Sequence, residues 1–163
     1  MIYTKYYFKT DRVKVKDAEI SDVFALSPNL REKDKREIWK SHHHTSEAAL
    51  LQGFTNSVLC FTVERNEKPI CIFGVVPDNL IGEKGFIWLL ASPELAKIKK
   101  AFLVNSPKFI DIMLEHYPLL FNYVDICNTE SIKWLEWCGA EFGVITPYGA
   151  EKELFQYFQF RRK

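Results

Sequence analysis

Four residues in the first half of the chain carry side chains that can move protons or bind metals. His42, His43 and His44 are consecutive in the segment SHHHTSE, and imidazole titrates near neutral pH and ligates transition metals. Adjacent residues of a helix point in different directions, so the three rings cannot all face one ion there, and we expect a polar surface turn rather than a metal site. Glu64, on an extended segment, carries a carboxylate that can accept a proton. We take His44 and Glu64 as candidate general bases.

A second set of polar residues lies in the segment SPELAKIKKAFLVNSPKFIDIMLEHYP. Ser106 followed by Pro107 is typical of a helix N-terminus, with the serine as N-cap and the proline in the first turn. The free N–H groups and positive dipole end of such a helix favour an anion. Lys97, Lys99 and Lys100 precede this start and add positive charge. They either support anion binding or form an ordinary solvated surface.

The segment CNTESIKWLEWCGAEFG has the pattern of a capped helix that ends at a glycine. Asn128 is a suitable N-cap, and Gly139 suits the left-handed residue that ends a helix. Between them, Ile132, Leu135 and Cys138 recur every three residues and form one apolar face. The local pattern therefore predicts a packing helix followed by a strand.

Composition limits the class of protein. The chain has 163 residues, with 22 Lys and Arg against 21 Asp and Glu, so it lacks the one-signed field that attracts nucleic acid or anionic lipid. No run of about 18 apolar residues predicts a membrane span. The cysteines, at positions 60, 71, 127 and 138, show no Cys-x-x-Cys spacing. We therefore expect four buried thiols instead of disulfides or a zinc site.

The hydrophobic pattern predicts one α/β domain spanning residues 1–163. Predicted strands cover residues 2–8, 57–64, 69–76, 85–92, 119–126 and 154–160, and predicted helices cover residues 18–26, 46–54, 106–117 and 128–139. The 85–92 segment lacks polar alternation, which predicts a central strand covered on both faces. Leu30 to Lys40 is strongly charged, with Ile38 and Trp39 as apolar anchors.

The four tryptophans divide into two pairs. Trp88 and Trp134 lie in apolar segments and are expected in the core. Trp39 and Trp137 have charged neighbours, and we expect either a groove or partner surface there or partial core burial.

The order of these segments resembles the GCN5-related N-acetyltransferase (GNAT) fold. The resemblance rests on FIWLLAS, PKFIDIMLEHYP and the Asn-x-x-Ser pattern of VDICNTESIKWLEWCGAEFG, and covers about Val58 to Phe160. Together with PYG and the terminal LFQYFQF, these segments are most similar to small GNAT-like proteins of bacteriophages, including those grouped with podophage internal virion proteins. The resemblance implies a mixed sheet with splayed central strands, flanked by helices, and an acyl-CoA molecule in the gap between those strands.

The resemblance also implies which residues contact acetyl-CoA. Backbone groups of Leu89, Leu90 and Ala91 would hydrogen-bond the pantetheine amides. The helix start at Ser106 would receive the pyrophosphate, and the motif residues Asn128 and Ser131 would shape the cleft. An amine of a small molecule or a protein would be the acceptor, with His44 or Glu64 as its base.

Two departures from the family pattern set the alternative function. The glycine-rich turn that commonly holds pyrophosphate is absent, and Leu135 stands where many members have a proton-donating tyrosine. The first hypothesis is an acetyl-CoA-dependent N-acetyltransferase. The second is a phage virion or host-interaction protein that keeps the fold without turnover. Both place the protein in the host cytoplasm or in a phage virion, without nucleic acid or membrane.

Overall fold

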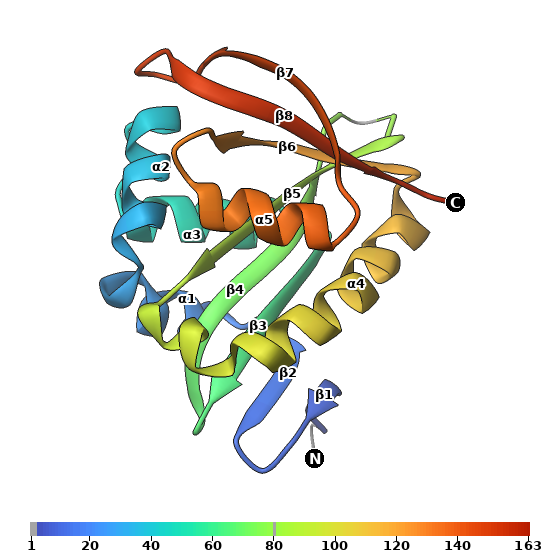
Figure 1. Cartoon of the computed structure of the whole chain (residues 1–163). Helices are drawn as coiled ribbons and strands as arrows, with labels where there is room; N and C mark the ends of the chain where they lie inside the picture. Colours follow the sequence, from blue (N-terminus) through green and yellow to red (C-terminus); the bar gives the residue numbers. More distant parts are fainter. Residues whose placement is uncertain (1–2, 80) are drawn as a thin grey trace.

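The computed structural model describes residues 3–79 and 81–163 (Figure 1). Its strands are β1 (Tyr6–Lys9), β2 (Val13–Asp17), β3 (Leu59–Arg65), β4 (Lys68–Pro77), β5 (Lys84–Ala91), β6 (Leu119–Asp125), β7 (Glu141–Tyr148) and β8 (Glu153–Arg161). Its α-helices are α1 (Ile20–Leu26), α2 (Glu32–His42), α3 (Ser46–Asn56), α4 (Lys99–His116) and α5 (Thr129–Trp137). Short 3-10 helices cover Ser27–Asn29 and Pro93–Ile98.

The described strands form one mixed sheet in the order β1-β2-β3-β4-β5-β6-β8-β7. Neighbouring strands are antiparallel except for β5 and β6, which run parallel. This parallel pair is joined only from Lys84 to Phe86 on β5, although β5 continues to Ala91. The two central strands therefore splay apart, and a gap opens between their carboxyl ends.

Gly85 explains why β5 and β6 can approach closely before they diverge. A Cβ atom at this position would lie 2.5 Å from the Val75 side chain and 3.0 and 3.1 Å from those of Tyr117 and Leu120. A side chain at this point would force the strands and α4 apart.

Helices cover the two faces of the sheet in different ways (Figure 1). On one face, α1 and α3 pack on β4 and bury Val23, Leu26, Leu50 and Ile72 completely. On the opposite face, α4 and α5 lie over a core that includes Phe61, Phe73, Phe109 and Met113.

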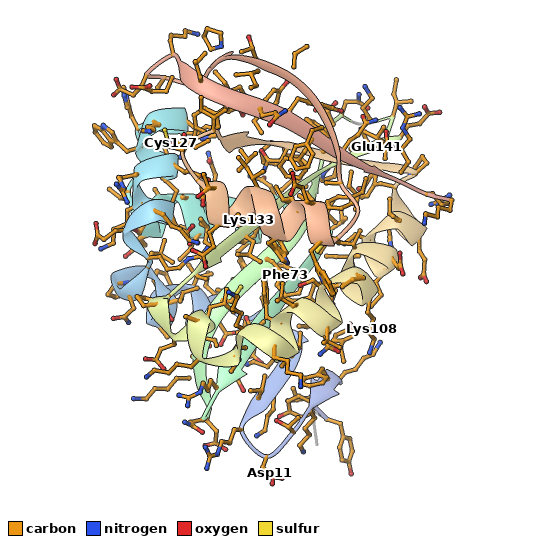
Figure 2. The ribbon with its side chains drawn as sticks, in the orientation of Figure 1. Asp11, Phe73, Lys108, Cys127, Lys133 and Glu141 are labelled. Atoms are coloured by element: carbon orange, nitrogen blue, oxygen red, sulfur yellow. The ribbon has the colours of Figure 1, made fainter. Side chains whose placement is uncertain are left out.

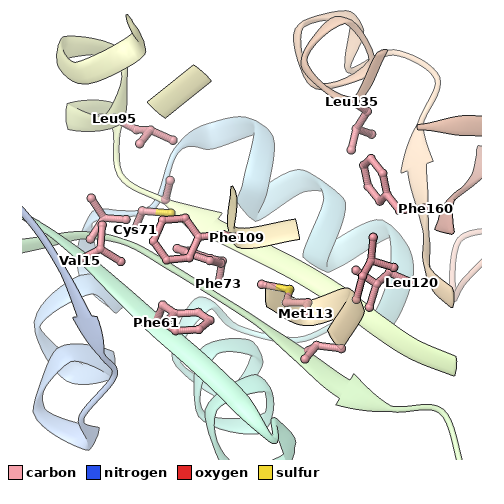
Figure 3. Packing of buried hydrophobic residues seen from close by; sticks show 14 of the residues in the cluster. Val15, Phe61, Cys71, Phe73, Leu95, Phe109, Met113, Leu120, Leu135 and Phe160 are labelled. Atoms are coloured by element: carbon pink, nitrogen blue, oxygen red, sulfur yellow. The ribbon is translucent and has the colours of Figure 1, made fainter. Parts of the chain in front are cut away.

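Figure 3 shows Phe61, Phe73 and Phe109 gathered on one side of this core and Leu135 facing Phe160 on the other. Phe109 contacts both Phe61 and Phe73 edge-on, with ring centroids 5.4 and 5.3 Å apart.

The α2 helix joins the two sides of the splay. Near its start, the Arg31 backbone N–H donates to the Ala91 carbonyl at the end of β5 (2.8 Å). Near its end, Lys40 pairs with Asp125 at the end of β6 (2.7 Å). Beyond Lys40, the Ser41 carbonyl accepts a backbone bond from the β7–β8 turn. The helix thus closes the wide end of the gap.

Several sequence predictions are confirmed. The fold is a single-domain mixed α/β sheet with a splayed central pair, and β5 is covered on both faces as predicted. Asn128 caps α5, with its Oδ1 accepting from the Ser131 N–H (3.2 Å), and Gly139 follows the helix at φ +89°. The cap and the glycine stop depend on residues close together in sequence, which is why the local pattern predicts them, whereas the splayed central pair was implied by the resemblance.

The predicted start of α4 is wrong. The helix begins at Lys99, so Ser106 lies inside it and is not an N-cap, and Pro107 is an internal proline. The segment SPELAKIKKAFLVNS was expected to be a connection between strand and helix. It forms a 3-10 helix and the first two turns of α4 instead.

Smaller predictions also needed correction. The DRVKVKD segment contains β2, a strand that the pattern did not predict. Strand β1 spans Tyr6–Lys9 and not residues 2–8, and Ile2 lies outside the described residues. All four cysteines are free, as predicted, but of the four only Cys71 is buried. Cys60 and Cys138 are partly exposed, and Cys127 is exposed (Figure 2). Trp39 is 54% exposed and does not anchor α2, whereas Ile38 is buried as predicted.

Candidate functional site

A cavity of about 730 Å³ lies on the α4–α5 face, between these two helices and the sheet. Its size falls in the usual range of about 300–1,000 Å³ for small-molecule sites. Phe73 of β4 is visible on its floor, between α5 and α4 (Figure 2). Residues from every one of β1 to β6, from β8, and from α2, α4 and α5 contribute to the lining. The cavity includes the gap between β5 and β6.

Polar backbone groups on the β5 edge are available inside this gap. The backbone pairing of β5 with β6 ends at Phe86. One residue further along β5, the Ile87 carbonyl accepts a hydrogen bond from the Asn122 side chain of β6. Two residues further along β5 than Leu89, the Ala91 N–H donates to Asp34 (3.0 Å). Because backbone groups of alternate residues point the same way, Leu89 presents its N–H and C=O to the gap between these two closures. Leu89 is thus the open position on the strand edge.

An internal proline ties α4 to α5 above the cavity. Pro107 has no N–H to donate to the Leu103 carbonyl one turn earlier. The Trp137 indole N–H donates to that carbonyl instead (3.2 Å). One turn of α5 away, the Trp134 indole N–H donates to Ser106 Oγ (3.1 Å). This substitution of side-chain donors explains how α4 tolerates a proline in its interior.

The carboxylate of Glu37 lies at the end of the cavity where α2 meets α5. It lines the cavity and accepts a hydrogen bond from the Asn128 side-chain amide (2.9 Å). Burial, with added repulsion from Asp34 and Asp125, raises the pKa of Glu37 to about 7, although the Asn128 hydrogen bond acts in the opposite direction. A carboxylate with this pKa exchanges protons near neutral pH.

Other charged residues around Glu37 are already paired. Arg31 makes two hydrogen bonds to Asp34 (2.9 and 3.0 Å). Lys33 on α2 pairs with Glu130 on α5 at 2.7 Å. Among the residues that the structure describes, no cation lies within ion-pair distance of Glu37, whose hydrogen-bond donor is the neutral Asn128 amide. Glu37 is therefore a partly buried carboxylate without a protein counter-ion.

The structure brings together some of the residues predicted for cofactor contact. Leu89, Ser106 and Ser131 all line the cavity. Leu90 packs against the opposite face of the sheet with Ile72 and Leu50, and the Ala91 backbone groups are occupied by α2. Asn128 acts behind the cavity wall by capping α5 and holding Glu37. Of the three strand residues, Leu89 alone combines an open backbone edge with a place in the cavity lining.

The two candidate bases lie elsewhere. Glu64 is absent from the cavity lining, and its side chain pairs with Lys16 (3.2 Å) in a network that includes Asp22. His44 follows the C-terminal end of α2, where its ring stacks on that of His42 with centroids 5.5 Å apart. No cluster of three or more potential metal ligands occurs in the part of the chain that the structure describes.

Sequence reasoning missed Glu37 and Asn122. Glu37 shares a helix face with Asp34, three residues earlier, and adjoins the buried Ile38. This spacing within a charged segment was the available signal, but its partner Asn128 is 91 residues away. Asn122 interrupts the apolar part of β6, between Phe121 and Tyr123, which is the corresponding signal for a polar residue inside the sheet.

The start of α4 lies at the mouth of the cavity. Ile98, Lys99, Ala101 and Phe102 line this part, so the first-turn N–H groups of α4 adjoin the cavity. Lys97 instead pairs with Glu94 (2.9 Å). The helix start at which the sequence predicted an anion site therefore lies about two turns before Ser106, at Lys99.

Comparisons with solved structures show which fold this is. Spermidine N-acetyltransferase from Vibrio cholerae, in complex with CoA and spermine, matches 93% of this chain and 96% of its own with a TM-score of 0.68 and 14% identity. Ard1 from Thermoplasma volcanium matches with a TM-score of 0.72 at 11% identity, over 93% of this chain and 99% of its own. A GNAT-family acetyltransferase from Bacillus anthracis matches with a TM-score of 0.67 at 10% identity, over 96% and 98%. The chain has the GNAT fold.

Sequence comparison adds a partial likeness to a phage protein. Residues 79–144 match the family model described as Bacteriophage T7, probable scaffold protein Gp13. The probable scaffold protein gp13 of Escherichia phage T7 is 29% identical over 109 residues, which cover 63% of this chain and 74% of that protein. The matched region includes β5, α4, β6 and α5, the elements around the gap.

None of the described helices is long and apolar enough to cross a membrane.

Proposed function

We propose that residues 1–163 form one acyl-CoA-binding domain that transfers an acyl group to an amine. The observation that carries the proposal is the gap between β5 and β6, with the open Leu89 backbone edge at one side and the carboxylate of Glu37 at its end. The CoA-bound Vibrio cholerae acetyltransferase of the same fold supports the choice of ligand.

The residues around the gap suit the parts of such a ligand. The Leu89 N–H and C=O would hydrogen-bond the amides of the pantetheine arm, as a strand edge does. The first turn of α4, with Lys99, would receive the phosphates, because helix N-termini and lysines favour anions. Bound acyl-CoA supplies the thioester whose acyl group is transferred.

Glu37 would act as the base. An acceptor ammonium gives one proton to the Glu37 carboxylate, and the free amine attacks the thioester carbonyl. The N–C bond forms as the C–S bond breaks, and the second nitrogen proton goes to the departing sulfur. Glu37 then releases its proton to solvent. Asn128 positions Glu37 by donating a hydrogen bond to its carboxylate. The side chain of Leu135, which is buried, has no ionisable proton and therefore cannot protonate the leaving thiolate.

A thermal-shift titration with acetyl-CoA and CoA tests binding. Ligand at a hundred times its dissociation constant should add about 2.7 kcal/mol to the free energy of unfolding. For a domain of this size the midpoint should rise by roughly 5 to 10 °C. Native mass spectrometry would show bound CoA as a fixed mass increment. The proposal is refuted if the unfolding midpoint does not rise and native mass spectrometry shows no bound CoA.

Thiol release with a panel of amines and polyamines tests transfer. Glu37→Gln should lower kcat by about 10² to 10⁴-fold, the usual contribution of a general base. The control is Glu136→Gln, an exposed residue of α5 outside the cavity lining, which should leave kcat unchanged. Equal activity of the two variants would show that another group takes the proton.

The alternative function is a phage assembly or host-interaction protein that retains the fold. Its support is the likeness to the probable scaffold protein of phage T7 over residues 79–144, together with a leucine where related enzymes have a tyrosine. This alternative predicts no thiol release with any amine.

A further inference from the structure

Two aromatic side chains flank the gap on the face of the sheet where α1 and α3 pack. Phe86 on β5 is paired with Phe121 on β6, and their rings touch edge-on with centroids 5.6 Å apart. Side chains two residues apart on a strand point to the same face, so Trp88 and Tyr123 are the next pair along these two strands. Both of them line the cavity. The cavity therefore reaches through the gap to this face of the sheet.

The two rings of this second pair are separated from each other. Beyond Phe86 the parallel strands are no longer joined, and they diverge toward α2 (Figure 1). The ring of Tyr123 contacts those of Tyr148 and Tyr157, and the described part of the chain shows no ring contact between Trp88 and Tyr123. Since both rings line one cavity, the cavity lies between them. We call the space between Trp88 and Tyr123 the aromatic cleft.

Each ring of the aromatic cleft is supported from the side away from the gap. The Trp88 indole N–H donates to Ser57 Oγ (2.8 Å), and the ring lies against Gly53, where a Cβ atom would come within 2.6 Å of it. Tyr148 stacks on Tyr123, with centroids 4.2 Å apart and planes 15° from parallel. Gly53 belongs to α3, which packs on β4, and Tyr148 belongs to β7, so the two supports stand on opposite sides of the gap. The other side of each ring faces the cleft.

Glu37 lies at the end of the aromatic cleft. Lys40 of α2 pairs with Asp125, which is two positions beyond Tyr123 on β6. Glu37 precedes Lys40 by three residues, so the two side chains share one face of α2. The Glu37 carboxylate therefore lies beside the end of β6. Two residues of a strand span about 7 Å, which sets the distance along β6 from the Tyr123 position to this end.

The charges around the cavity limit what an acceptor can carry. The described lining contains four carboxylates, and three of them are paired, Asp34 with Arg31, Glu130 with Lys33 and Glu32 with Lys35. Glu37 is the fourth, and its donor is the neutral Asn128 amide. One unpaired carboxylate matches an acceptor with one ammonium group, whereas the further charges of a polyamine would lose water without gaining a partner. We therefore expect the rest of the acceptor to be uncharged.

An aromatic ring suits a space between two flat side chains. Aromatic rings attract one another in stacked or edge-on contacts at centroid distances of about 4.5 to 7 Å, and the attraction exceeds that from burial of apolar area alone. With C–C bonds of about 1.5 Å, a linker of roughly two or three carbons would join a ring beside Tyr123 to a nitrogen beside Glu37.

We propose that the acceptor is an arylalkylamine whose ring lies in the aromatic cleft while its amine meets Glu37. This inference rests on the proposed acyl transfer and names the class of acceptor for that same site. Leu89, the residue after Trp88, points to the opposite face, so donor and acceptor meet in the gap from the two sides of the sheet.

Direct binding tests the proposal without requiring turnover. The probes are 2-phenylethylamine and 2-cyclohexylethylamine, which share one ammonium group and the same linker, titrated into the full chain with CoA present and followed by ligand-observed NMR. The dissociation constant should be about five-fold lower, or more, for 2-phenylethylamine, because two ring contacts act together. Spermidine should bind more weakly than 2-phenylethylamine. Equal dissociation constants for the aromatic and the saturated amine would overturn the proposal.

Tyrosine variants locate the ring. Tyr123→Leu removes one wall of the aromatic cleft and should raise the dissociation constant of 2-phenylethylamine about ten-fold, whereas Tyr123→Phe keeps a ring and should retain the affinity. Tyr6→Leu is the matched control, because Tyr6 is an exposed residue of β1 outside the cavity lining, and it should change nothing. Circular dichroism checks folding, and Trp88→Leu replaces Tyr123→Leu if the latter does not fold. Equal affinity in wild type and the leucine variant would place the ring elsewhere and refute the cleft.

Thiol release from acetyl-CoA separates this inference from the function on which it rests. If both amines are acetylated with equal kcat/KM and bind equally, the aromatic cleft proposal fails while acyl transfer stands. If CoA does not bind and no amine releases thiol, the acyl-transfer function fails. The NMR comparison of wild type with Tyr123→Leu, repeated without CoA, then still decides whether the cleft binds an aryl amine.

Discussion

The two faces of the central sheet are built from similar apolar residues but packed to different degrees. On the α1–α3 face, Val23, Leu26, Leu50 and Ile72 are each 0% exposed. On the α4–α5 face, buried residues such as Val63 and Phe73 line a large cavity. A closed core maximises contacts, whereas a cavity gives up some of them and leaves space for a ligand. One face therefore contributes mainly stability and the other mainly the site.

The largest effect should come from breaking the closed face. Leu50→Ala removes a fully buried side chain from α3, and substitutions of this kind cost about 2 to 5 kcal/mol. Urea melts measure the loss, and the affinity of the folded protein for CoA should not change. A cost below about 1 kcal/mol would show that this face is more loosely packed than its exposure indicates.

Glu37 should make stability depend on pH. Its folded-state pKa of about 7 lies above its usual value of about 4.5, so the native state binds more protons between these values. The contribution of Glu37 to stability is fully present below about pH 4.5 and is lost as the pH rises through about 7, with a slope of at most about 1.4 kcal/mol per pH unit. Denaturant melts across this range measure it.

Substitution isolates the residue responsible for that slope. Glu37→Gln should flatten the pH dependence between about pH 4.5 and 7, and the exposed Glu136→Gln should not. An unchanged slope in Glu37→Gln would assign the proton uptake to a different group.

The Asn128 cap should contribute a smaller amount. Asn128→Ala removes the acceptor for the Ser131 N–H and should cost about 1 kcal/mol. It also removes the amide that donates to Glu37, whose pKa should rise further. Asn128→Asp is the comparison, because aspartate keeps the cap but not the donor. NMR titration of the Glu37 carboxyl would distinguish the two effects, and an unaltered pKa in Asn128→Ala would contradict the contact.

The smallest effect concerns the link between α4 and α5. Trp137→Phe removes the donor to the Leu103 carbonyl and should cost about 0.5 kcal/mol, the low end for a hydrogen bond, because this bond is exposed. In a Pro107→Ala background the cost should shrink, because the substituted alanine supplies a backbone N–H to the same carbonyl. A double-mutant cycle measures this coupling, and two independent, additive losses would mean that Trp137 does not compensate for Pro107.

Features that depend on neighbouring residues could be predicted from the amino-acid sequence. The apolar segment of β5, the hairpin of β3 and β4, and the helix between Asn128 and Gly139 all follow from hydrophobic period, turn residues and caps within a dozen positions. The resemblance to the GNAT fold depended on the order of the same segments. Local interactions are sufficient for these elements because each one is specified inside its own window of sequence.

The start of α4 and the identity of the site depend on contacts between distant segments. Pro107 is a sound signal for a helix start, but Trp137, 30 residues later, supplies the donor that allows the helix to continue through it. The pKa of Glu37 depends on burial against α5 and on Asn128, 91 residues away. Leu89 is available only because β5 and β6 separate beyond Phe86. Burial and long-range hydrogen bonding produce these properties, and both arise only once the chain has folded.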